Sequence, residues 1–163
     1  MIKLKKLTLN DVNEKYVKWM NDKNVFKYSD QSKKRHSIKD IKKYVKDRLN
    51  SNEIIFGIFY QKIHIGNIKL GPIDYLNKAS EISYFIGEKN YWGMGIGTIA
   101  IKNVIKIAKK KGLKKLIAGC VIKNTASQKV LKKNKFILEG KLKSQYIINN
   151  TRTTNLIFGL VVR

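Results

Sequence analysis

Three glycines at alternate positions form the part of this sequence with the clearest chemical meaning. Gly93, Gly95 and Gly97 follow a strand-like run at 81–86, and a stretch with helical periodicity begins directly after them. Glycine permits a positive φ and leaves no Cβ atom in the path of a ligand. The N–H groups of residues 94–98 could then converge at the start of a helix, an arrangement that binds phosphate groups. We therefore expect this turn to hold a pyrophosphate.

The glycine pattern alone leaves other interpretations open. A dinucleotide-binding turn would need Gly-x-Gly-x-x-Gly near the first strand and an acidic residue about 20 positions later. Here the spacing is Gly-x-Gly-x-Gly, the turn lies in mid-chain and the acid is missing. The Gly-Lys-Ser/Thr ending of a P-loop is absent as well. A tight turn that binds no ligand remains the alternative.

The other reactive side chains form no comparable pattern. The single cysteine, Cys120, cannot make an intramolecular disulfide, and its spacing from His36 and His64 is not that of a metal site. We expect Cys120 to be a core thiol on a strand, and we expect no metal.

The chain carries a formal charge of +24, and lysine supplies most of it. Only four of the 35 cationic residues are arginine, and lysine occurs in nearly every segment. Proteins that read bases or clamp phosphates favour arginine and collect the charge on one face. The composition therefore favours a solvated lysine surface over a nucleic-acid-binding stripe. The positive field would still attract a phosphate-rich ligand.

The elements that must position the glycine turn follow from hydrophobic periodicity. We predict strands at 2–9, 54–60, 63–70, 81–86, 116–122, 136–143 and 156–162, and helices at 11–20, 38–49, from the glycine turn to 111, and at 125–133. A turn is predicted at Asn149-Asn150, and Asn10 or Asp11 should cap the first helix. No linker interrupts residues 1–163, so we expect a single domain with helices on both faces of a mixed sheet.

No apolar run reaches the ~20 residues of a membrane span. The segment 1–6 alternates apolar and cationic residues, unlike a secretory signal. We therefore expect a soluble cytoplasmic protein.

Two motifs resemble those of the GNAT acetyltransferases, and in particular their RimJ/RimL-like branch. Residues 92–97 lie on the acetyl-CoA signature Gln/Arg-x-x-Gly-x-Gly/Ala, with Trp92 at the position of the usual Gln or Arg. Farther along, Asn124-Thr-Ala-Ser127 and Phe136 are similar to the branch's block Asn-x-x-Ser…Lys-x-Gly-Phe, with Lys135 in place of the usual glycine. Residues 19–22, Trp-Met-Asn-Asp, also resemble this branch, so the resemblance spans nearly the whole chain.

The resemblance implies an α+β fold with a mixed, mostly antiparallel sheet of about seven strands and helices on both faces. The strands at 81–87 and 116–122 would splay apart and hold acetyl-CoA, the co-substrate, in the cleft between them. The pantetheine arm would bond the backbone of residues 85–87, and Asn124 would face it or simply cap the next helix. The residues that the resemblance assigns to acetyl-CoA are Phe85, Ile86, Gly87, Trp92, Gly93, Met94, Gly95, Ile96, Gly97, Thr98, Asn124 and Ser127.

Acetylation of an amine needs a neutral nitrogen, so a carboxylate that removes a proton is expected. The resemblance points to Glu81 as the first candidate base and to Glu88 as the second, although each could equally be a solvated acid. Many GNAT enzymes protonate the leaving thiolate with a tyrosine, and Leu131 stands at that position here. Ser127 would take this role, or would be a small residue that allows close packing.

The sequence does not identify the amine. The branch includes enzymes that act on α-amino groups of ribosomal proteins, and similar enzymes acetylate amino sugars on nucleotide carriers. The helices at 11–20 and 38–49, the loop between them and residues 143–152 are expected to line the acceptor pocket. A non-catalytic module that binds coenzyme A or an acidic partner is the alternative, and the oligomeric state stays open, a homodimer included.

Overall fold

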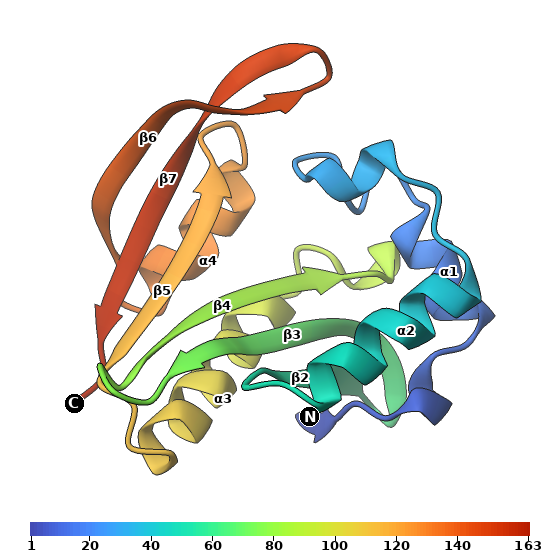
Figure 1. The fold of residues 1–163 in the computed structure, drawn as a ribbon, viewed down its shortest axis with the longest axis horizontal. Helices are drawn as coiled ribbons and strands as arrows, with labels where there is room; N and C mark the ends of the chain where they lie inside the picture. Colours follow the sequence, from blue (N-terminus) through green and yellow to red (C-terminus); the bar gives the residue numbers. More distant parts are fainter.

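A seven-stranded mixed sheet runs through the computed structural model, which describes residues 1–163 (Figure 1). The strand order is β1-β2-β3-β4-β5-β7-β6, and every neighbouring pair is antiparallel except β4 and β5. The strands are β1 (Ile2–Lys6), β2 (Ile54–Tyr60), β3 (Ile63–Asp74), β4 (Ala79–Ile86), β5 (Lys115–Val121), β6 (Ile137–Ile148) and β7 (Thr151–Val161). The helices are α1 (Glu14–Met20), α2 (Ile38–Leu49), α3 (Ile96–Lys110) and α4 (Thr125–Lys133). The predicted α+β class and element order are confirmed. None of these helices is both long enough and apolar enough to cross a membrane.

The two faces of the sheet are covered unequally. On one face, α3 and α4 pack over the main core, in which Ile68, Leu70 and Val104 have no exposed surface. On the other face lie α1 and α2 (Figure 1), and the core cluster there has seven buried residues against 21 in the main core. The smaller cluster leaves a cavity between α1, α2 and the sheet, and the candidate site lies on that face of the sheet.

The first helix begins later than its sequence suggests. The side chain of Asn13 accepts a hydrogen bond from the N–H of Tyr16, and α1 starts at Glu14. The predicted cap at Asn10 or Asp11 is therefore wrong. The Asp11 carboxylate instead accepts hydrogen bonds from the N–H and the hydroxyl of Thr8, which closes a short 3-10 turn at residues 9–11.

Four strands, β3, β4, β6 and β7, are longer than predicted, and β4 begins at Ala79 rather than at residue 81. β3 continues past Leu70 to Asp74 after a register shift against β4. β6 and β7 both extend to the predicted turn, where Asn149 and Asn150 have φ angles of 49° and 59°. Positive φ at both central residues is what a two-residue hairpin turn requires. Most side chains of β6 are exposed, so a pattern based on hydrophobicity misses much of this strand.

The two central strands separate soon after they begin. β4 and β5 are paired only at residues 79–81 and 115–117. Beyond these positions β4 is bonded only to β3, and β5 only to β7. The predicted splayed strands are therefore present, and one edge of β4 is unpaired after Glu81 (Figure 1).

Candidate active site

The glycine-rich turn leads from β4 into α3 without a side-chain cap. Gly93 and Gly95 have φ angles of 78° and 75°, in the left-handed region, and Gly95 is the N-cap residue of α3. A Cβ atom at either position would have no neighbour within 4 Å, so backbone conformation rather than crowding requires glycine there. The other three α-helices have side-chain caps, at Asn13, Ser37 and Asn124. The first N–H groups of α3 are thus left available to an anion.

Gly97 has a different role from the other two glycines. It already belongs to α3 and is not among the residues with positive φ. A Cβ atom there would lie 3.0 Å from the Cε2 atom of Tyr84. Glycine at this position lets α3 pack closely against β4.

Trp92 ties the turn back to the end of β4. Its Nε1–H donates a hydrogen bond of 2.9 Å to the carbonyl oxygen of Ile86, and its side chain is 44% exposed. The Gly87 N–H bonds to Ile65 on β3, so the peptide groups of Ile86, one residue earlier, face the unpaired edge of β4. Trp92 therefore occupies one acceptor on the edge to which the resemblance assigns the pantetheine arm.

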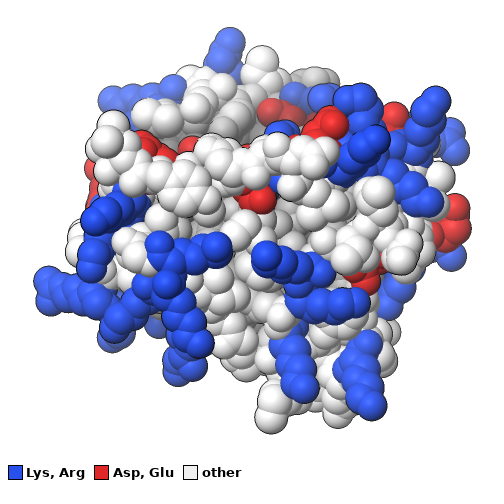
Figure 2. Space-filling model, turned by 60° about the horizontal axis from the view of Figure 1, so that its bottom comes forward, with Lys and Arg blue, Asp and Glu red and all other residues white.

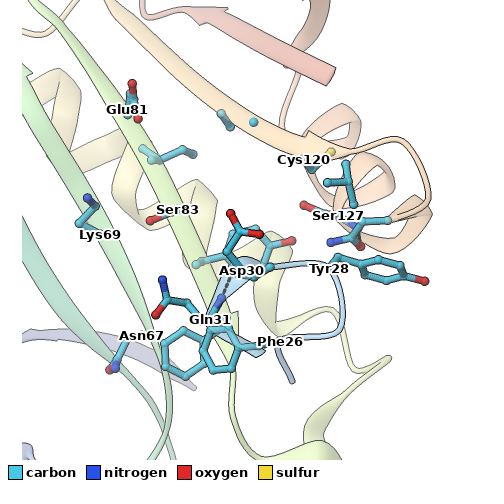
Figure 3. A pocket seen from close by; sticks show the side chains of 18 of the residues that line it. Phe26, Tyr28, Asp30, Gln31, Asn67, Lys69, Glu81, Ser83, Cys120 and Ser127 are labelled. Carbon is cyan, nitrogen blue, oxygen red and sulfur yellow. Dashed lines mark hydrogen bonds between the residues drawn. The ribbon is translucent and has the colours of Figure 1, made fainter. Parts of the chain in front are cut away.

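A cavity of about 1010 Å³ lies between α1, α2 and the separated strands. Its wall includes residues of α1, of α2, of the loop between them and of the β6–β7 hairpin, the segments expected to line an acceptor pocket. The predicted site residues that it brings together are Phe85, Asn124, Glu81 and Ser127. Glu81 and Ser127 are labelled in Figure 3. Those that are not part of its wall are Ile86, Gly87, Glu88, Trp92, Gly93, Met94, Gly95, Ile96, Gly97 and Thr98.

Glu81 lies at the point where β4 and β5 separate. It is the last residue of β4 that pairs with β5, opposite Ile117. Its side chain is exposed to the cavity and forms neither a salt bridge nor a hydrogen bond in the structure. Figure 3 shows Glu81 and Ser83 on the same strand, apart from Ser127 on the far side of the cavity. A carboxylate without protein partners in such a wall can accept a proton from a bound group.

Glu88 is held outside the cavity by two contacts. Its Oε1 atom accepts a hydrogen bond of 3.0 Å from Trp19 Nε1 and lies 3.2 Å from Lys15 Nζ. Both partners belong to α1, so this carboxylate joins α1 to the end of β4. The neighbouring Gly87 serves the same junction, because a Cβ atom there would lie 2.2 Å from the Trp19 ring.

The start of α4 brings three neutral protic groups together. The side chain of Asn124 caps α4 by accepting from the Ser127 N–H at 3.1 Å. Burial raises the pKa of Tyr84 and that of Cys120, and the nearby Ser127 side chain opposes both rises. Both groups therefore stay protonated at neutral pH, next to the Ser127 hydroxyl.

Two polar residues of the cavity wall, Asp30 and Asn67, were not predicted as site residues from the sequence. Asp30 opens a short 3-10 turn in the α1–α2 loop and pairs with Lys33 at 3.4 Å. Asn67 on β3 is 4% exposed and also lines the cavity (Figure 3). No motif marks either residue, because Asp30 lies in a segment that reads as a polar loop and Asn67 occupies an ordinary strand position.

Charge is dispersed outside the cavity. Figure 2 shows lysine and arginine side chains over most of one face of the molecule rather than along one stripe. No group of three or more His, Cys, Asp or Glu side chains is placed to hold a metal ion. The electrostatic field is therefore broadly positive, and it favours the approach of anions.

The family described as "Acetyltransferase (GNAT) domain" matches residues 2–137 of this chain. The chain belongs to the GNAT acetyltransferase family. The resemblance to the GNAT family drawn from residues 92–97 and 124–136 is therefore confirmed.

Two curated relatives have names that refer to ribosomal acetylation. The chain is 35% identical over 97 residues to the ribosomal-protein-serine acetyltransferase of Escherichia coli (strain K12), over 59% of this chain and 54% of that protein. It is 29% identical over 113 residues to the putative ribosomal N-acetyltransferase YdaF of Bacillus subtilis (strain 168), over 69% and 61% of the two chains. The chain thus spans little more than half the length of the first relative.

Solved structures share the fold along the whole chain. A crystal structure of the ribosomal L7/L12 α-N-protein acetyltransferase RimL with coenzyme A has a TM-score of 0.91 at 20% identity, covering 99% of this chain and 94% of that one. The microcin C7 self-immunity acetyltransferase MccE, in complex with acetyl-CoA and AMP, has a TM-score of 0.87 at 26% identity, covering 99% and 92%. The fold is therefore the GNAT fold.

Proposed function

We propose that this chain is an acetyl-CoA-dependent N-acetyltransferase that modifies the α-amino group of a protein or peptide. The observation that carries the proposal is the uncapped start of α3 next to the unpaired edge of β4. Gly97 packs against Tyr84, and Tyr84 lines the cavity, so the glycine turn and the cavity adjoin. A phosphate-bearing ligand held at the turn could extend a thioester into the cavity.

Acetyl-CoA fits the residues present in this region. Its pyrophosphate would bind the free N–H groups of residues 94–98, where Gly93 and Gly95 leave open space. Its pantetheine arm would follow the unpaired edge of β4 from Gly87 toward Tyr84, with Asn124 on the opposite side. Trp92 departs from the usual Gln or Arg, but a site made of backbone N–H groups does not depend on that side chain.

The proposed reaction is a direct transfer of the acetyl group. The neutral amine attacks the thioester carbon, and an N–H group of the β4 edge donates to the oxyanion of the tetrahedral intermediate. Glu81 takes the proton of the amine. It lies three residues from Tyr84, about 10 Å along the strand, so water would relay this proton. The carbon–sulfur bond then breaks, the Ser127 hydroxyl relays a proton from water to the departing thiolate, and Glu81 releases the proton of the amine to water.

Glu88 is a weaker candidate for the base, because its carboxylate is engaged by Trp19 and Lys15 away from the cavity. Its contacts fit a role in fixing α1 on the sheet. We therefore assign the proton transfer to Glu81 and the positioning of α1 to Glu88.

The relatives favour a protein α-amino group as the acceptor. Both curated relatives have names that refer to ribosomal acetylation, whereas no observation favours an amino sugar. The cavity volume of about 1010 Å³ also leaves room for a peptide end beside the thioester.

The test is an acetylation assay with purified protein, acetyl-CoA and a peptide that begins with serine. Release of free thiol should accompany a mass increase at the peptide α-amine, and the same peptide with a blocked amino terminus should give neither. A nucleotide-linked amino sugar and an alkylamine serve as comparison acceptors. Binding of acetyl-CoA without thiol release for any amine would favour a non-catalytic coenzyme A-binding module instead.

A further inference from the structure

The cavity wall contains a buried amide that has a hydrogen-bond partner at only one of its two polar atoms. Asn67 is 4% exposed and lines the cavity, and its Nδ2 atom has no hydrogen-bond partner. Buried polar atoms in native proteins nearly always have a partner, because an unpaired one costs stability. An unpaired donor in a cavity wall is therefore a candidate contact for a ligand.

His64 fixes which end of this amide is free. Its Nε2 atom lies 3.1 Å from the carbonyl oxygen of Gly66 and 2.7 Å from Oδ1 of Asn67. A carbonyl oxygen only accepts, so Nε2 must carry a hydrogen, and the Asn67 atom that faces it must be the oxygen. Burial lowers the pKa of His64, which favours the neutral ring with its hydrogen on Nε2. The NH2 group of Asn67 is consequently the free end.

Tyr16 adds a second neutral donor beside Asn67. Burial raises the pKa of the Tyr16 phenol, while the neighbouring Asn67 side chain opposes the rise, so the phenol stays protonated. No protein atom accepts a hydrogen bond from its hydroxyl, and the Asn67 side chain lies beside the phenol oxygen. The Tyr16 ring packs on Phe85 with centroids 6.1 Å apart, and Asn67 is the β3 partner of Phe85. Both donors thus lie next to the strand along which the acyl arm is proposed to run.

The neighbouring charges are already engaged. Lys69, the next residue on the same face of β3, lies 3.0 Å from a carboxylate oxygen of Glu53. Arg48 lies 2.8 Å from the other oxygen of that carboxylate. The free donors at this end of the cavity are therefore uncharged, and they suit an uncharged oxygen atom.

We infer that Asn67 and Tyr16 bind a carbonyl or hydroxyl oxygen of the amine acceptor and so select acceptors that carry one. This subsite rests on the proposed acetyltransferase function. The carbonyl oxygen of the first residue of a peptide would satisfy both donors. An alkylamine or polyamine has no such oxygen and would leave both unpaired. Selection thus arises from the penalty on the wrong acceptor as well as from the bond to the right one.

The test compares peptide binding with and without the free amide. The affinity of a Ser-Ala-Ala amide is measured by calorimetry on protein saturated with coenzyme A, which cannot react. Asn67→Leu keeps the shape of the side chain and removes the donor, so the affinity should fall about tenfold. Affinity for coenzyme A should not change, and affinity for hexylamine should rise, because the variant has one donor fewer to leave unpaired. Thr153→Val is the matched control, since Thr153 is another buried residue with an unpartnered side-chain oxygen, and it does not line the cavity.

Each outcome decides between the subsite and its alternative. Unchanged peptide affinity in Asn67→Leu, or an equal loss in Thr153→Val, would overturn the subsite. So would a wild-type protein that binds no oxygen-bearing amine. If Asn67→Leu fails to fold, Tyr16→Phe, which removes a single hydroxyl, carries the same test with a smaller expected loss. Turnover with acetyl-CoA is measured separately, so a protein that binds the peptide but does not acetylate it refutes the enzyme while the subsite stands.

Discussion

A matched pair of substitutions at Gly95 isolates the electrostatic part of the proposed pyrophosphate site. Gly95 is the N-cap of α3 with φ at 75°, and a side chain there would enter open space. Asn and Asp both tolerate the left-handed region, and both are good N-cap residues. Gly95→Asn and Gly95→Asp therefore have similar shape and similar backbone strain. They differ by one negative charge.

The expected magnitude follows from Coulomb's law. A carboxylate about 5 Å from the nearest phosphate charge, at an effective dielectric constant of about 20, is repelled by ~3 kcal/mol. This corresponds to a roughly 100-fold weaker affinity for acetyl-CoA in Gly95→Asp than in Gly95→Asn. The Asp variant should be at least as heat-stable as the Asn variant, because an acid at the start of a helix interacts favourably with its dipole. Loss of binding could not then be attributed to unfolding.

Calorimetric titration with acetyl-CoA measures the difference, and it should be repeated at low and high salt. At about 1 M salt the screening length falls to about 3 Å, so the gap between the two variants should narrow. Equal affinities of the Asp and Asn variants at low salt would mean that no phosphate lies near residue 95. The proposed orientation of acetyl-CoA would then be wrong.

Three further substitutions test the base, the packing of α1 and the start of α4. Glu81→Gln should lower turnover most below the pKa of the α-amine, about 8, where the acceptor must lose a proton; a pH–rate profile identical to that of the wild type would eliminate Glu81 as the base. Gly87→Ala should lower the free energy of unfolding by about 2 kcal/mol or more, since the added methyl would meet the Trp19 ring at 2.2 Å; urea unfolding equal to that of the wild type would contradict this packing. Asn124→Ser should keep the helix cap and the melting temperature but raise the KM for acetyl-CoA, and an unchanged KM would reduce Asn124 to a cap.

Local signals in the sequence were enough to predict most of the fold. The Ser37 and Asp40 capping box opens α2 where it was expected, because both hydrogen bonds are made within four residues. The start of α1 was predicted wrongly because another local contact, between Thr8 and Asp11, competes with the helix cap. From the sequence alone Asp11 could cap a helix equally well, but its carboxylate accepts hydrogen bonds from Thr8 in a 3-10 turn.

Site features that depend on local contacts were predicted from the sequence, whereas those that depend on distant contacts were not. The glycine turn depends on local backbone conformation, so the sequence predicted its position, although the close packing of Gly97 against Tyr84 appears only in three dimensions. Glu88 looked like a candidate base because it follows directly after the strand that leads to the glycine turn. Its engagement with Trp19, 69 residues away in the chain, appears only in three dimensions.

Four polar residues on the sheet show why sequence patterns could not predict the cavity. Asn67, Lys69, Glu81 and Ser83 share one face of β3 and β4 and alternate with apolar residues of the main core, such as Ile68 and Ile82. Such alternation is typical of a strand with one face in water. Here α1 and α2 lie over that face and leave a cavity, in which Asn67 is buried while Glu81 and Ser83 stay exposed. Polar residues beneath a helical layer thus indicate an enclosed site, but only once the helices have been placed over the strands.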